Sequence, residues 1–184
     1  RAVFKSSYAV IPRGCFTDIV TSTLPLWKNM RMWIVARPMT GFAETFSQYV
    51  VQLEPNGGSE NPESNSDVQS VLFLTSGSAV LKVNSERHVL KSGSYVYIPA
   101  GSEWSIWSNS NEITNFHWIR KVYKDVKGVE RPTAFVKSET ECEDVEMPNS
   151  NSTWFTKRFV DANDIRHDMH VNIVTFQPGG VIPF

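Results

Sequence analysis

The chain has 184 residues, of which 41% are hydrophobic and 20% are charged. This balance excludes wholesale disorder, a collagen-like chain and a small disulfide-stapled scaffold. Eighteen Lys and Arg residues against nineteen Asp and Glu residues give a net charge of −1, which predicts no nucleic-acid partner. The apolar runs are far shorter than the ~20 residues that a membrane helix needs, so no membrane partner is expected either.

Short runs of aromatic and β-branched residues alternate with turn residues along most of the chain. Regular spacing of this kind is typical of an all-β sandwich or barrel. In chain order, the predicted strands are Glu44–Leu53, Val71–Thr75, Ala79–Val83, Tyr95–Ile98, Ser105–Ser108 and Asn115–Tyr123. A helix is predicted only over Asp161–His167, and it is short.

Two segments of the chain resemble each other. Val50–Pro55 and Ile173–Pro178 both have the order apolar, apolar, polar, apolar, polar, Pro, and each runs into a Gly-Gly pair. Leu53 and Phe176 hold equivalent places, 123 residues apart. The pattern predicts a duplicated β unit whose second copy has only begun where the sequence stops.

A strand and a tight turn are predicted around Gly93, Pro99 and Gly101, followed by Trp104. The pattern resembles the second conserved motif of the cupin superfamily: a Gly, five residues, Pro-x-Gly, two residues and a metal-binding His. The strand leads into the turn, and the next strand directs its first side chain into the barrel. Here that side chain is Trp104, whose indole is only a donor and offers no lone pair to a metal.

The first cupin motif is a Gly, five residues, His-x-His, a spacer, Glu, six residues and a Gly. Gly57 and Gly77 hold the two outer positions in this chain. Counting from them puts Glu63 and Asn65 at the histidine positions and Ser70 at the glutamate position. Of these and the Trp104 position, only Glu63 offers a good ligand for a transition metal, so we expect no metal in the first barrel.

A closer resemblance is to the (S)-ureidoglycine aminohydrolase family of allantoin breakdown. It rests on Ser7–Ile11, Phe116–Lys121, Asp168–Ile173 and the Phe176-x-Pro-Gly run, and it extends over the whole chain. The resemblance implies a bicupin, in which two jelly-roll barrels (double-stranded β-helices) follow one another. In such a protein this chain would be the first barrel and the incomplete start of the second.

The family is described as Mn²⁺-dependent hydrolases that remove ammonia from ureidoglycine and give ureidoglycolate. The resemblance implies that Mn²⁺ is bound in the second cupin by a Glu-x-His-x3-His set and a later Gln, which would lie beyond Phe184. The catalytic residues are therefore expected outside this chain. A bound Mn²⁺ would anchor the substrate as a Lewis acid while a carboxylate moves protons.

The strand predicted at the start of the second barrel supplies candidate substrate-lining residues. His170, Asn172 and Val174 alternate along it and share one face. If that face is internal, these side chains lie near the expected metal site. The alternative is that the polar side chains face solvent. His117 is expected to be a satisfied core histidine, and His167 is expected at the surface.

The predicted organisation has four parts: an N-terminal arm at 1–40, a first cupin barrel at 41–136, a linker at 137–153 and the start of a second barrel at 154–184. Other functions stay open, namely a non-catalytic bicupin that binds a small metabolite or serves a structural role, and an oxalate-decarboxylase-like or dioxygenase-like metal cupin. The expected partner is a small-molecule substrate. A homo-oligomer is an open alternative, because sheet edges often pair with a neighbour. Bacterial family members are expected in the cytoplasm, whereas plant members carry targeting segments.

Overall fold

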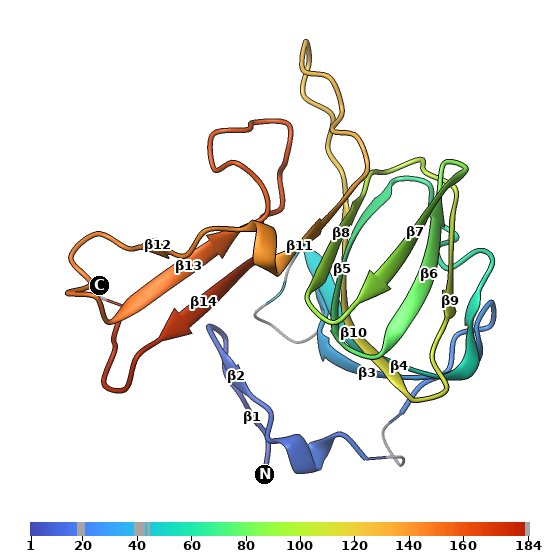
Figure 1. Cartoon of the computed structure of the whole chain (residues 1–184), viewed down its shortest axis with the longest axis horizontal. Helices are drawn as coiled ribbons and strands as arrows, with labels where there is room; N and C mark the ends of the chain where they lie inside the picture. Colours follow the sequence, from blue (N-terminus) through green and yellow to red (C-terminus); the bar gives the residue numbers. More distant parts are fainter. Residues whose placement is uncertain (18–20, 39–42, 44, 183–184) are drawn as a thin grey trace.

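The fold is a rolled sheet of nine strands, accompanied by a two-stranded hairpin and a separate three-stranded sheet (Figure 1). The computed structural model describes all residues except 18–20, 39–42, 44 and 183–184. The strands are β1 (Val3–Phe4), β2 (Ala9–Val10), β3 (Lys28–Ala36), β4 (Phe46–Ser59), β5 (Val68–Ser76), β6 (Ser78–Val83), β7 (Glu86–Lys91), β8 (Ser94–Ile98), β9 (Trp104–Ser108), β10 (Thr114–Val122), β11 (Phe135–Ser138), β12 (Val145–Glu146), β13 (Trp154–Arg158) and β14 (Asn172–Phe176). The described residues also form the 3-10 turns η1 (Arg13–Cys15) and η4 (Glu139–Glu141). Among the described residues, no helix has the length and apolar character needed to cross a membrane.

The rolled sheet has the strand order β11-β8-β5-β10-β4-β9-β6-β7, and β3 also pairs with β4. Every pairing is antiparallel, and most neighbours in the sheet are distant in sequence. The predicted all-β roll is therefore confirmed. β3 lies ahead of the barrel boundary expected at residue 41, and its contacts with β4 make it part of the same sheet.

All six predicted strands occur as β4, β5, β6, β8, β9 and β10, although β4 runs on to Ser59. Glu44, the predicted first residue of β4, lies outside the described residues. Several strands were not predicted, including β3, β7, β11 and β13. Of these, β7 is mostly polar and pairs with β6 across a two-residue turn at Asn84 and Ser85. Both turn residues have positive φ angles, 47° and 74°, which suits the tight hairpin turn that matches strand twist.

The helix predicted over Asp161–His167 is wrong, since this segment forms two successive turns. The Asp161 carboxylate accepts a hydrogen bond from the backbone N–H of Asn163, and Asp164 does the same with Arg166. Aspartate side chains that bond to the backbone two residues ahead compete with helical hydrogen bonding. His167, expected at the surface, has a side chain only 6% exposed and packs edge-on against Tyr97, with ring centroids 4.6 Å apart.

Two apolar clusters hold the chain together. The first fills the inside of the roll and includes Leu53, Leu72, Leu81, Ile106 and Trp118. The second covers the outer face of the roll beside the three-stranded sheet. Its members are Val71, Tyr95, Tyr97, Ile119, Cys142, Phe159 and Met169.

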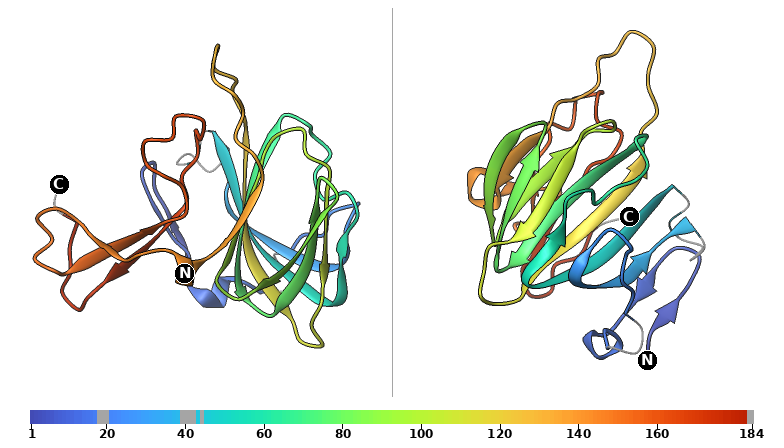
Figure 2. Two further views of the ribbon diagram at one scale, coloured as in Figure 1. Left: turned by 45° about the horizontal axis from the view of Figure 1, so that its top comes forward. Right: turned by 90° about the vertical axis from the view of Figure 1, so that its right-hand side faces the viewer.

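The second cluster joins the three-stranded sheet to the roll. The sheet, ordered β12-β13-β14, stands beside the roll and does not extend it (Figure 2). Phe159 stacks on Tyr95 with ring centroids 4.2 Å apart and an interplanar angle of 6°. Val171 and Ile173 also pack against the cluster. β11 and β12 both lie within or at the edge of the region expected to be a linker, 137–153.

Candidate functional site

The four cupin-motif positions of the first barrel are engaged by protein groups. Ser70 on β5 and Trp104 on β9 are buried, whereas Glu63 and Asn65 lie in the connection between β4 and β5. The Ser70 hydroxyl accepts a hydrogen bond from the indole N–H of Trp118, at 3.0 Å. A tryptophan donor therefore occupies the place opposite the motif's glutamate position.

Aromatic rings surround Trp118 in the interior of the roll. Its ring centroid lies 5.5 Å from that of Trp27, 5.7 Å from that of Tyr49 and 6.0 Å from that of Trp104. The contacts with Tyr49 and Trp104 are edge-to-face, an arrangement that the charge distribution of aromatic rings favours. The Trp104 side chain lies inside the barrel, as the motif spacing predicts, and it packs within the core cluster there.

Glu63 is held by an arginine. The Arg120 guanidinium donates from Nε to Oε2 and from a terminal nitrogen to Oε1 of Glu63, both at 2.6 Å. The Glu63 side chain is only 6% exposed, and the same guanidinium lies 5.2 Å above the Trp118 ring. A two-pronged pair of this kind satisfies both carboxylate oxygens and leaves the guanidinium packed on an aromatic face.

Asn65 points away from this cluster. Its side-chain oxygen accepts a hydrogen bond from the backbone N–H of Asp67 at 2.9 Å, and the residue is exposed. One paired carboxylate, one hydroxyl, one indole and one distant amide do not fit a transition-metal ion. In the described part of the chain, no group of three or more His, Cys, Asp or Glu side chains is arranged to hold a metal ion. We therefore assign no chemical step to a metal in this barrel.

A groove runs between the outer face of the roll and the segment that enters β14. One part of it, about 440 Å³, is lined by Gln48, Lys121, Asp168, His170 and Asn172 among others. A neighbouring part of about 260 Å³ shares Gln48 and Asn172 and adds His117, Phe73 and Ile173. Two predicted substrate-lining residues, His170 and Asn172, thus border the groove, Asn172 as the first residue of β14, while Val174 lines neither part. His170 precedes β14 and does not belong to it.

His117 is the titratable group at the floor of this groove. Its Nδ1 lies 3.4 Å from the side-chain nitrogen of Gln48, and burial lowers its pKa from the ordinary value. The ring is therefore neutral near pH 7 and accepts a hydrogen bond from Gln48 at Nδ1. It lies on the outer face of β10, so the expected core histidine is a half-buried residue of the groove.

A chain of polar contacts fixes the entry to β14. The Tyr97 hydroxyl donates to Gln69, Gln69 donates to Asp168 at 2.5 Å, and the Lys121 ammonium donates to the Asp168 carboxylate at 3.0 Å. Lys121 also donates to the Asp168 backbone carbonyl at 2.8 Å. No short sequence pattern indicates this network, because its partners lie far apart in the chain.

Both the sequence and the fold of the chain are similar to those of known proteins. A family model described as a cupin domain matches residues 49–120. The chain aligns over its full length with the crystal structure of the "Putative Glyoxylate Induced Protein" from Pseudomonas aeruginosa, at 52% identity and a TM-score of 0.93, and it covers 69% of that chain. The chain belongs to the cupin family. The fold and the motif spacing of the barrel are thus those of a cupin. The residues at the four metal-ligand positions of the motifs, however, are Glu63, Asn65, Ser70 and Trp104.

A curated relative adds a second finding. The (S)-ureidoglycine aminohydrolase of Escherichia coli (strain K12) is 23% identical over 176 residues, which is 93% of this cupin. The chain spans 66% of that relative's length. The resemblance to this family predicted from the sequence is therefore confirmed as kinship. The Ylba protein of E. coli has the same fold, with a TM-score of 0.83 and 23% identity. The match covers 97% of this chain and 68% of the Ylba chain.

Proposed function

We propose that the whole protein is a hydrolase that releases ammonia from (S)-ureidoglycine, and that its active site lies in a second cupin unit beginning at residues 154–180. Kinship with an (S)-ureidoglycine aminohydrolase over 93% of the chain supports the activity. Two observations support the location of the active site outside the first barrel. Aromatic side chains fill the interior of that barrel, and the β3–β4 hairpin recurs as the β13–β14 hairpin.

The repeat pairs the β3–β4 hairpin with the β13–β14 hairpin. In the first, Met30 lies opposite Leu53; in the second, Trp154 lies opposite Phe176. The next pairs along each ladder also correspond, Met32 with Val51 and Thr156 with Val174. The six-residue similarity seen in the sequence is therefore accompanied by the same strand pairing and register.

Two glycines show the same repeat in the turn region. A Cβ atom added to Gly57 would lie 2.3 Å from the backbone oxygen of Asn29, and one added to Gly180 would lie 2.4 Å from that of Thr153. Only glycine allows the backbone to come this close in either place. Gly57 begins the run that contains the first cupin motif, so we infer that Gly180 holds the corresponding place in a second unit.

In the proposed reaction, water displaces the amine from the carbon that bears both the amino and the ureido groups. A C–O bond forms, the C–N bond breaks, and ammonia leaves with ureidoglycolate as the other product. Mn²⁺ is the proposed cofactor, and it would supply Lewis-acid polarisation in the second unit. No residue of this chain is proposed as its ligand.

The test is an assay of the full-length protein with (S)-ureidoglycine and Mn²⁺. We expect ammonia release well above the unaided decay of the substrate, and formation of a single enantiomer of ureidoglycolate. A metal-free preparation and a heat-denatured one are the controls. Ammonia release at the control rate, or a racemic product, would contradict the proposal. A chain ending at Phe184 is expected to show only the control rate.

A further inference from the structure

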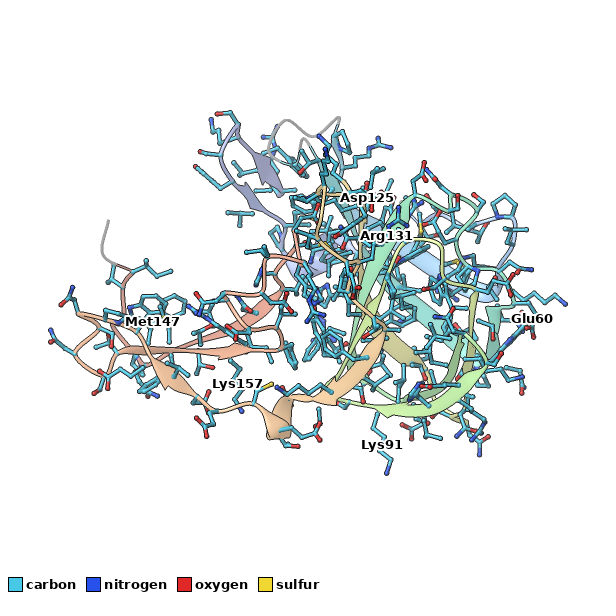
Figure 3. The ribbon with its side chains drawn as sticks, turned by 90° about the horizontal axis from the view of Figure 1, so that it is seen from above. Glu60, Lys91, Asp125, Arg131, Met147 and Lys157 are labelled. Carbon is cyan, nitrogen blue, oxygen red and sulfur yellow. The ribbon has the colours of Figure 1, made fainter. Side chains whose placement is uncertain are left out.

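The three-stranded sheet has one face toward the roll and one face away from it. Lys157 and Ile173 lie opposite each other and point toward the roll. Figure 3 labels Lys157 on β13. Its ammonium lies 3.5 Å from the Asp144 carboxylate and 3.4 Å from the backbone oxygen of Glu139. Val171 and Ile173 both pack toward the roll, and side chains alternate along strands, so the Asn172 side chain between them points to the opposite face, as does that of its partner Arg158. Asn172 borders the groove only because β14 begins there.

The outward face corresponds to a lumen face in the first barrel. The pairs Trp154–Phe176 and Thr156–Val174 correspond to Met30–Leu53 and Met32–Val51. All four of those first-barrel residues are buried inside the roll, with exposures of 5% or less. One further step along the ladder, Ile34 lies opposite Tyr49 in the first hairpin, and Arg158 lies opposite Asn172 in the second.

This last pair marks a chemically important end of the lumen. In the first barrel, the Tyr49 ring packs against Trp118, whose indole N–H is bonded to Ser70 at the motif's glutamate position. The Ile34–Tyr49 end of the ladder therefore lies beside the positions that carry metal ligands in other cupins. Arg158 and Asn172 hold the equivalent end in the second unit.

The second unit replaces an apolar pair with a polar pair. Both Arg158 and Asn172 are exposed, and neither side chain has a hydrogen-bond or ion-pair partner within the residues that the structure describes. Residues directly opposite in an antiparallel pair have Cβ atoms about 5 Å apart, so both side chains can reach one small ligand. A guanidinium binds a carboxylate through two parallel hydrogen bonds, and an amide matches the donors and acceptors of a ureido group.

We propose that Arg158 anchors the carboxylate of the substrate in the lumen of the second unit and that Asn172 bonds its ureido group. The inference rests on the proposed function, which requires a substrate with both groups on one small molecule. It assigns Arg158 and Asn172 as the residues that determine specificity for a substrate of that class, a short-chain ureido acid.

Kinetics of the full-length protein test the anchor. Arg158→Met is expected to raise KM for (S)-ureidoglycine roughly 10- to 100-fold, the range for loss of a hydrogen bond to a charged group, with kcat changed far less. Arg158→Lys should recover part of the loss. The control is Arg87→Met, which removes an exposed arginine from β7 of the first barrel and should leave KM unchanged. An unchanged KM in Arg158→Met would overturn the proposal.

A binding experiment separates this inference from the proposed activity. The probes are N-carbamoylglycine, which has the carboxylate and the ureido group but no leaving amine, and its neutral carboxamide. Calorimetry should show that the full-length protein prefers the acid, that Arg158→Met removes the preference, and that Asn172→Leu weakens both probes. Equal affinity of wild type and Arg158→Met for the acid, or no binding of the acid to wild type, would contradict the anchor. If the acid binds as expected but ammonia is not released, only the proposed activity fails.

Discussion

The first barrel and the three-stranded sheet begin with the same hairpin and then differ at the face that it presents. In the first barrel, the lumen beyond Tyr49 is filled by Trp27, Trp104 and Trp118. On the three-stranded sheet, the corresponding face carries Arg158 and Asn172 without protein partners among the described residues. Large aromatic side chains therefore fill this end of the first barrel, whereas the matching pair on the three-stranded sheet is polar, although the register of the two hairpins corresponds.

The strongest test of this comparison is removal of the ring at the centre of the filled lumen. Trp118→Ala leaves a large cavity and frees the buried Ser70 hydroxyl, so we expect it to lower the free energy of unfolding by about 3–5 kcal/mol. Trp107→Ala is the matched control, because Trp107 is only half-buried and its indole N–H bonds to exposed Glu60. Urea denaturation measures both variants. Equal losses would show that the lumen is not packed as described.

The ion pair at the mouth of the first barrel should have the next largest effect. Arg120→Met leaves the nearly buried Glu63 carboxylate without its partner, which should cost about 2–3 kcal/mol of unfolding free energy. The double variant Arg120→Met with Glu63→Leu should recover most of that loss, since no unpaired charge remains. Denaturation curves of the three proteins form the cycle. Failure of the double variant to recover would mean that Arg120 acts mainly through its contact with Trp118.

Removing the lysine that joins the two regions should have a smaller and local effect. Lys121→Met breaks the contact with Asp168, and a partly exposed ion pair contributes about 1 kcal/mol or less. Hydrogen exchange should quicken at residues 159–176 and stay unchanged inside the roll. Lys82→Met, a change of an exposed lysine on β6, is the control. Uniform quickening across the chain would show that the two regions open as one.

The smallest predicted effect concerns acid. Burial lowers the pKa of both His117 and His167, and both side chains lie where the segment leading into β14 meets the roll. The unfolded chain then binds protons at higher pH than the folded chain, so stability should decline as the pH falls below about 6.5. His167→Gln should make that decline shallower, as measured by urea midpoints between pH 7.5 and pH 5.5. An equally steep decline in the variant would exclude His167 as a contributor.

Much of the roll follows from local pattern, and the failures have specific causes. Strands β5 and β8 stand out because Val71–Thr75 and Tyr95–Ile98 combine aromatic and β-branched residues. Strand β7 was missed because its partner β6 and the turn between them, not its own polar residues, hold it in the sheet. The helix was expected where two aspartates cap their own turns.

In the candidate site, too, some features follow from short sequence patterns and others depend on contacts between distant residues. Motif spacing was sufficient to place Trp104 at the start of a barrel strand and Ser70 at the glutamate position, two residue types that suit a metal poorly, although the strand predicted from Val71 in fact already includes Ser70. It could not reveal that Arg120 holds Glu63, because the two residues are 57 positions apart and neither has an unusual local sequence. Contacts of this kind depend on the register of β10 against its neighbours, which no short pattern specifies.

The aromatic cluster on the outside of the roll has a consequence for biosynthesis. All nine strands of the roll are available once Ser138 has left the ribosome, yet their outer face still lacks Phe159 and Met169. For that interval the nascent chain presents Phe73, Tyr95 and neighbouring rings to solvent or to a chaperone. Arrival of the following twenty to thirty residues closes this window, so slow translation after Ser138 would prolong the stage at which the chain is most prone to aggregate.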